Sequence, residues 1–140
     1  MILACNYEEV TALSHGVRVI LLDSEGTGAV VASPPAARAA VEALAPRLTG
    51  DLAVPTLADQ RELERAVEFI VVRLRREMNA TVLETHPAAE EAVAAYFDFA
   101  HAYAVLGRLR EMGREMSAIV EVMTGEPPNE EMATSFQFPE

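Results

Sequence analysis

The stretch from 87 to 124 decides the fold and reads PAAEEAVAAYFDFAHAYAVLGRLREMGREMSAIVEVMT. Apolar residues and one glycine recur in it at alternating steps of four and three, at Ala88, Ala92, Ala95, Phe99, Ala102, Leu106, Leu109, Gly113, Met116, Val120 and Met123. Such steps follow one side of an α-helix, and a sustained 3.5-residue period is typical of a helix that packs along a partner in a left-handed supercoil. We therefore predict one helix over 87–124, on the order of 55 Å long, which Gly125 ends.

A second long helix is predicted over 56–83. Thr56 is a good N-cap, with Asp59 at the capping-box position three residues later. Apolar residues then follow at helical spacing, at Leu63, Val67, Ile70, Leu74 and Met78. Because Pro87 disfavours helix in the residue before it, the chain is expected to turn near His86. The two long helices should therefore form an antiparallel hairpin.

A shorter helix is predicted near the start of the chain, over 6–22. Asn6 and Glu9 have the spacing of a capping box, and apolar residues recur behind them at helical spacing. Gly16 leaves an alternative open, in which this helix ends early and 17–22 form a strand.

A second short helix is predicted over 33–44, with Ser33 as its N-cap, after a glycine-containing turn at 23–32. The predicted fold is all-α: an antiparallel hairpin of two long helices with two shorter helices packed on it, similar to a four-helix bundle. We expect a single helical domain over 1–125 and an acidic C-terminal tail over 126–140. The tail is expected to be frayed, the alternative being that it docks into a groove of a partner.

The last helix is also expected to carry an interface between protein chains. Because the helix before it is about ten residues shorter, residues beyond about Gly113 should overhang the hairpin and leave an apolar strip exposed. Such strips mark protein–protein contacts, and two-fold dimers are the commonest oligomers, so we predict a homodimer. Packing on the two shorter helices is the alternative. The expected interface residues are Leu106, Leu109, Gly113, Met116, Ile119, Val120 and Met123.

Composition narrows the classes of partner. The chain has 140 residues, of which 51% are hydrophobic, and 22 acidic against 11 basic residues give a net charge of −11. An acidic chain repels phosphate backbones and anionic lipids, so neither a nucleic-acid partner nor a membrane partner is expected. The single cysteine excludes a disulfide framework and suits a reducing compartment, so we expect a cytoplasmic protein.

Residues 92–107 are apolar nearly all round the predicted helix and are therefore expected to be buried on most sides. Within them Asp98 and His101 stand three residues apart, so both side chains should project from the same side of the helix. Asp98 is interpreted first as a structural acceptor for His101 or a tyrosine, because a buried carboxylate needs a partner. A second interpretation makes His101 a general acid or base oriented by Asp98.

A third interpretation is a metal site. The spacing Asp98-x-x-His101 resembles half of the Glu-x-x-His motif of di-iron helical bundles. In an antiparallel hairpin Glu68 falls about one turn from His101, so Glu68, Asp98 and His101 would together bind a divalent metal. The chain has one such motif where the di-iron pattern needs two, and a dimer would have to supply the second.

Common catalytic motifs, such as Gly-x-Ser-x-Gly, a phosphate-binding loop or His-Glu-x-x-His, do not occur. A basic cluster at Arg73, Arg75 and Arg76 is expected to be a solvated helix face. We therefore predict a non-enzymatic helical interaction or regulatory module that acts as a dimer without a cofactor. The alternatives are a ferritin-like metal-binding protein or oxidoreductase, and an acidic inhibitor or immunity-type protein that binds a basic partner surface.

Overall fold

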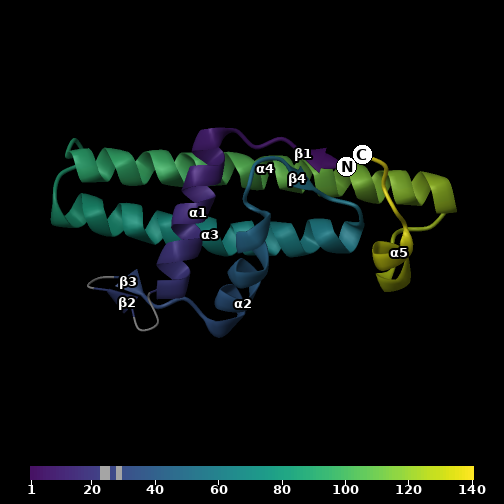
Figure 1. The fold of residues 1–140 in the computed structure, drawn as a ribbon, viewed down its shortest axis with the longest axis horizontal. Coiled ribbons are helices and arrows are strands. Elements are labelled where there is room, and N and C mark those ends of the chain that lie inside the picture. The colour runs from purple at the N-terminus through teal and green to yellow at the C-terminus, as the bar shows by residue number, and fades with distance from the viewer. Residues whose placement is uncertain (23–25, 28–29) are drawn as a thin grey trace.

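Two long antiparallel helices form the body of the molecule. In the computed structural model, which describes residues 1–22, 26–27 and 30–140, α3 (Leu57–Glu84) and α4 (Glu90–Thr124) lie side by side along the longest axis (Figure 1). A short turn at 85–89 joins them. The all-α class and the packing of the two long helices against each other are thus confirmed.

The ends of these helices follow from their capping residues. The Thr56 side-chain oxygen accepts a hydrogen bond from the Asp59 amide at 3.1 Å, as predicted for the start of α3. At the other end of the hairpin, Gly125 adopts a left-handed conformation with φ of 79° and donates its amide to the Glu121 carbonyl. The start of α4 at Glu90 is three residues later than predicted.

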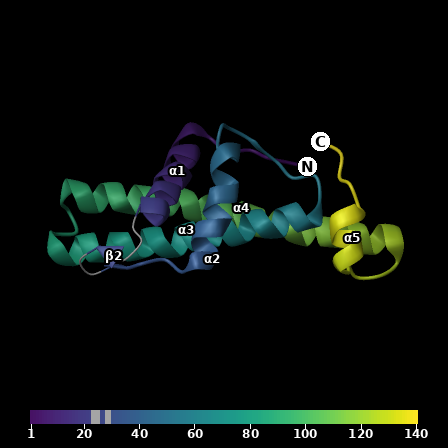
Figure 2. The same ribbon diagram turned by 60° about the horizontal axis from the view of Figure 1, so that its bottom comes forward.

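The first helix, α1 (Tyr7–Leu22), crosses both long helices near their middle (Figures 1 and 2). The predicted capping box is present, since the Glu9 amide donates to Asn6 Oδ1 at 2.8 Å and the Asn6 amide donates to Glu9 Oε1 at 2.9 Å. The helix continues through Gly16, so the strand alternative for 17–22 is wrong. A Cβ atom at position 16 would lie 2.4 Å from Ile70 Cγ2, which shows that this glycine allows α1 to approach α3 closely.

The second short helix, α2 (Pro35–Leu44), continues into a 3₁₀ turn (Ala45–Arg47) and packs on α1 and α3. The predicted N-cap role of Ser33 is wrong. Pro34 occupies the cap position without a side-chain hydrogen bond, because Pro35 provides the first helical residue. The Ser33 hydroxyl instead accepts a long hydrogen bond, at 3.4 Å, from Arg73 Nη1 of α3.

Four two-residue strands, which the sequence did not predict, appear in the described part of the chain. β1 (Ile2–Leu3) pairs antiparallel with β4 (Leu52–Ala53), and β2 (Gly26–Thr27) pairs antiparallel with β3 (Val30–Val31). The turn expected at 23–32 contains β2 and β3, and its residues 23–25 and 28–29 lie outside the described residues.

The C-terminal segment is ordered and packs on the hairpin. It forms α5 (Glu130–Ser135), which Asn129 caps by accepting a hydrogen bond from the Met132 amide at 2.9 Å. Phe138 is 6% exposed, and its amide donates to the Pro55 carbonyl at 2.8 Å. The expectation of a frayed end is therefore wrong, because this segment contributes apolar side chains to the core.

The core draws on most of the helices and on the strands at the N-terminal side of the fold, β1 and β4. The buried cluster takes residues from β1, α1, α2, β4, α3, α4 and the C-terminal segment. Within the described residues, no helix is both long and apolar enough to span a bilayer.

Candidate interaction surface

The residues predicted as an interface lie mostly inside the chain itself. Leu106, Leu109, Met116 and Val120 are at most 2% exposed, whereas Met123 is 69% exposed. Gly113 and Ile119 are partly buried. The expected overhang is covered because Ala133 and Phe138 of the C-terminal segment join the same buried cluster. A dimer through Leu106, Leu109, Met116 and Val120 would require these side chains to leave the core.

Gly113 has a defined role within the hairpin. The Gln60 side chain of α3 is 2% exposed, and its Nε2 donates to the Leu109 carbonyl at 2.7 Å and to Glu64 Oε1 at 3.0 Å. A Cβ atom at position 113 would lie 2.5 Å from that nitrogen. Gly113 therefore leaves room for a buried amide that links the two long helices.

The three predicted metal ligands do not come together. Glu68 of α3 lines a cavity beside Ser33, and Asp98 of α4 lies 3.9 Å from the His15 imidazole of α1. His101 Nδ1 donates to the Phe97 carbonyl one turn earlier, at 2.7 Å. Over residues 1–22, 26–27 and 30–140, no three His, Cys, Asp or Glu side chains form a group suited to a metal ion. Asp98 therefore contacts α1, and neither binds nor orients His101.

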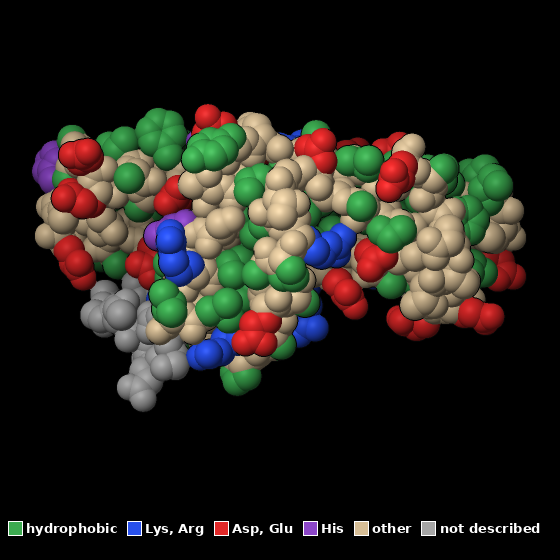
Figure 3. Space-filling model, viewed as in Figure 1, with side chains coloured by type: hydrophobic (Ala, Val, Ile, Leu, Met, Phe, Trp, Pro, Cys, Tyr) green, Lys and Arg blue, Asp and Glu red, His purple; other side chains and the backbone are tan. Residues whose placement is uncertain are grey.

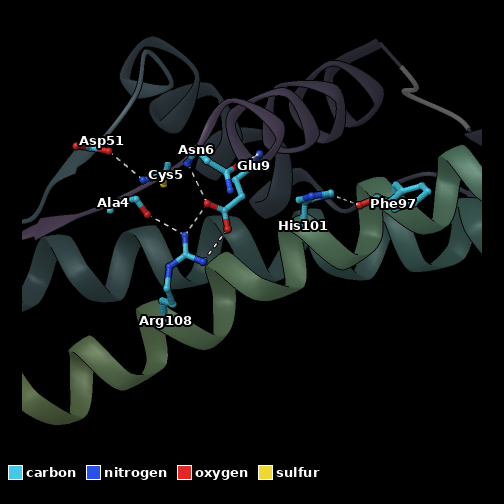
Figure 4. A network of polar contacts seen from close by, with 8 residues as sticks. All are labelled: Ala4, Cys5, Asn6, Glu9, Asp51, Phe97, His101 and Arg108. Carbon is cyan, nitrogen blue, oxygen red and sulfur yellow. Dashed lines mark hydrogen bonds and ion pairs between the residues drawn. The ribbon is translucent and has the colours of Figure 1, made fainter.

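One cluster of polar contacts fixes α1 on α4 (Figure 4). Both Arg108 Nη atoms bond the Glu9 carboxylate, at 2.6 and 2.8 Å, and Nη2 also donates to the Ala4 carbonyl at 2.8 Å. The hydrogen bonds from Arg108 lower the pKa of Glu9, and the same bonds raise the pKa of Arg108. Such two-pronged arginine–carboxylate pairs are strong and directional, so this contact holds α1 at a fixed angle.

Cys5 lies next to this cluster and is half-buried. Burial raises the pKa of its thiol, and the neighbouring Glu9 carboxylate raises it further. Because the thiolate is the reactive form, this environment disfavours a nucleophilic role.

The basic cluster of α3 is not uniformly solvated as predicted. Arg73 is 1% exposed, and its Nε donates to Glu77 Oε1 at 2.9 Å, whereas Arg75 and Arg76 are exposed. Arg73 forms part of the wall of a cavity of about 360 Å³ between α3 and the start of α2, lined by Ser33, Pro34, Arg65, Glu68, Phe69, Val72, Arg73 and Arg76.

The most unusual surface is an apolar stripe along the outside of α4, which we call the outer stripe. Its four large members are all more than 40% exposed: Val93 by 41%, Tyr96 by 56%, Phe97 by 55% and Tyr103 by 55%. Three small residues continue it at helical spacing, so that the whole stripe comprises Val93, Tyr96, Phe97, Ala100, Tyr103, Ala104 and Gly107. Figure 3 shows hydrophobic side chains gathered along the edge of the molecule where α4 runs.

The outer stripe contradicts the expectation that residues 92–107 are buried on most sides. On a helix with 3.6 residues per turn, its members project away from the side that carries Phe99, Ala102 and Leu106, which packs on α3. The sequence contained a signal for it, namely a second series of apolar residues at three- and four-residue steps, starting at Val93. With both faces apolar, the sequence could not show which face is covered.

Comparisons with protein-family models, curated proteins and solved structures give no match.

Proposed function

We propose that this protein is a non-enzymatic interaction module whose outer stripe binds a helix of a protein partner. The observation that carries the proposal is the exposure of three aromatic rings, Tyr96, Phe97 and Tyr103, within two turns of α4 on its outer side. Three rings that are half exposed leave about 300 Å² of apolar surface in water. This area lies in the range of the largest apolar patches on single proteins, which are often functional.

The scaffold under the outer stripe supports this proposal. Side chains on the other face of α4 are packed on α3, and the Glu9–Arg108 pair holds α1 across the same helix. A surface on a rigid helix loses little conformational entropy when it binds, which leaves more of the contact energy for affinity. Helices that bind through one face present apolar residues at three- and four-residue steps, as this stripe does.

A photo-crosslinking experiment tests the proposal. Benzoylphenylalanine is placed at Tyr103 within the outer stripe, and as a matched control at Tyr7, which is 80% exposed on α1. In cells that make the protein naturally, we expect a defined protein adduct from position 103 that is absent from position 7. The adduct should persist in high salt, because an apolar contact is not screened. A contact made by the acidic surface of an inhibitor would weaken under those conditions.

A second variant checks that the adduct depends on the stripe. Phe97→Glu puts a charge in the stripe while leaving the buried face of α4 unchanged, and it should abolish the adduct at position 103. Equal crosslinking at positions 103 and 7, or none at either, would overturn the proposed function.

A further inference from the structure

We infer that the partner of the outer stripe is a second copy of this chain, bound antiparallel through α4 with the two-fold axis at Ala100. The inference rests on the proposed function and names its partner. Three observations carry it: the sizes of the side chains along the stripe, the charges at its two ends, and the open space at Gly107.

The stripe is complementary to itself when reversed. With Ala100 opposite Ala100 of the second copy, each position lies level with the one equally far from residue 100 on the other side. Val93 then faces Gly107 and Tyr96 faces Ala104, so that large side chains meet small ones. Phe97 faces Tyr103, as an aromatic pair of the kind that stabilises interfaces. The small side chain of Ala100 at the centre allows the two helices to approach closely.

Gly107 fits this arrangement. Glycine within a helix costs about 1 kcal/mol relative to alanine, and a Cβ atom at this position would meet no atom within 4 Å in the single chain. Packing inside the chain therefore does not require this glycine, in contrast to Gly16 and Gly113. Opposite Val93 of a second copy, its missing side chain would make space for the valine.

One pair of opposite charges at the ends of the stripe fits the same register. Glu90 is exposed at its start and Arg110 beyond its end, whereas Arg114 is paired with the neighbouring Glu111. An antiparallel pair centred on Ala100 places Glu90 of one helix level with Arg110 of the other, and it also aligns the helix dipoles favourably. A parallel pair would place like charges together, Phe97 against Phe97 and Gly107 against Gly107.

The dimer should be weak. Two stripes of about 300 Å² each give less buried area than the 1,200–2,000 Å² of a standard interface. We therefore expect association that depends on concentration, over a range of about 10–300 µM, rather than a permanent dimer.

Sedimentation equilibrium over this range tests the association. We expect the average mass to rise with concentration from 15.2 kDa toward twice that value. Phe97→Glu and Tyr103→Glu should hold the mass at 15.2 kDa. Leu83→Glu is the matched control, because Leu83 is 84% exposed on α3 outside the stripe, and it should leave the association unchanged.

Cysteine crosslinking tests the orientation, in a Cys5→Ser background that removes the single native thiol. Ala100→Cys should form an intermolecular disulfide readily, because position 100 meets itself. Val93→Cys alone should not, since two copies of position 93 would lie about 21 Å apart along the helix axis, beyond the Cα separation of a disulfide. A mixture of Val93→Cys and Gly107→Cys chains should crosslink to each other.

The possible results distinguish failure of the dimer inference from failure of the proposed function. A chain that stays monomeric throughout, while position 103 crosslinks to a different protein in cells, would overturn the inference and leave the proposed function standing. Self-crosslinking of Val93→Cys would overturn the antiparallel register. A monomer with no adduct in cells would overturn both proposals.

Discussion

Replacing Gly16 with alanine should destabilise the protein, although alanine is the better helix former. A Cβ atom at this position would lie 2.4 Å from Ile70 Cγ2 and 3.3 Å from Ile70 Cβ. Carbon atoms in contact normally lie about 3.5–4.0 Å apart, so the overlap exceeds 1 Å. Ile70 is 0% exposed, and its branched side chain has little freedom to rotate away. The backbone of α1 must therefore shift away from α3.

The size of the effect follows from two opposing terms. Overpacking of a core costs about 1–3 kcal/mol, and replacement of glycine by alanine in a helix returns about 1 kcal/mol. Because the overlap is large, we expect a net loss of about 1–2 kcal/mol. Gly107→Ala is the matched control, since it has the same propensity gain and no neighbour within 4 Å, and it should stabilise the chain by about 0.5–1 kcal/mol.

Urea unfolding followed by far-ultraviolet circular dichroism measures both variants, in dilute solution where association is negligible. With an m-value of about 2 kcal/mol/M, the midpoint of Gly16→Ala should fall by about 0.5–1 M. The midpoint of Gly107→Ala should rise by a few tenths of a molar unit, about 0.3–0.5 M. If both substitutions raise the midpoint equally, the close contact between α1 and α3 at Gly16 is refuted.

Three further predictions concern the other contacts. Glu9→Gln should lower the free energy of unfolding by about 1–2 kcal/mol at neutral pH, at the low end because Arg108 is 42% exposed. Because the pKa of Glu9 is lowered, its stabilisation is present above the usual carboxyl pKa and is lost as pH falls through the lowered value. The urea midpoint of the variant should therefore fall less steeply on acidification than that of the unchanged protein. Phe138→Ala should cost about 3 kcal/mol and raise hydrogen exchange first in α5, whereas equal exchange throughout the chain would contradict a locally docked segment. Gly113→Ala should lower the free energy of unfolding by about 1 kcal/mol, because the added methyl group displaces the Gln60 amide. In thermal unfolding, the double variant Gly113→Ala, Gln60→Ala should lose less stability than the sum of the two single variants.

The helices and most of their ends could be predicted because their signals are local. The caps at Asn6 and Thr56 and the stop at Gly125 depend on residues within three or four positions, and the structure has all three. The cap at Ser33 failed because two consecutive prolines allowed the chain to begin its helix one residue later.

The partners of the helix faces could not be predicted. The stripe through Leu106 and Met116 is a packing surface, but the helix that it meets is α3 of the same chain, and the C-terminal segment contributes to the cluster around it. The periodicity of a helix indicates which side is apolar and contains no information on what covers it. The outer stripe was missed for the same reason, because a helix that is apolar all round is predicted to be buried on every side.

The long-range polar contacts had no local signal at all. Glu9 and Arg108 are separated by 99 positions, and the crossing angle of α1 that brings them together depends on the close approach at Gly16. The proposed convergence of Glu68 with Asp98 failed for the related reason that register alone does not say which way each side chain turns.

The N-terminus and the C-terminal segment are hydrogen-bonded to two consecutive residues, Val54 and Pro55. The amino group of Met1 donates to the Val54 carbonyl at 2.9 Å, and the Phe138 amide donates to the Pro55 carbonyl at 2.8 Å, so the two ends lie close together (Figure 1). A short peptide linker between them, with new ends opened in the exposed turn at 85–89, should give a circularly permuted protein with the same core. In that version α3 and α4 would become the last and first helices of the chain, and their pairing would no longer be a local event.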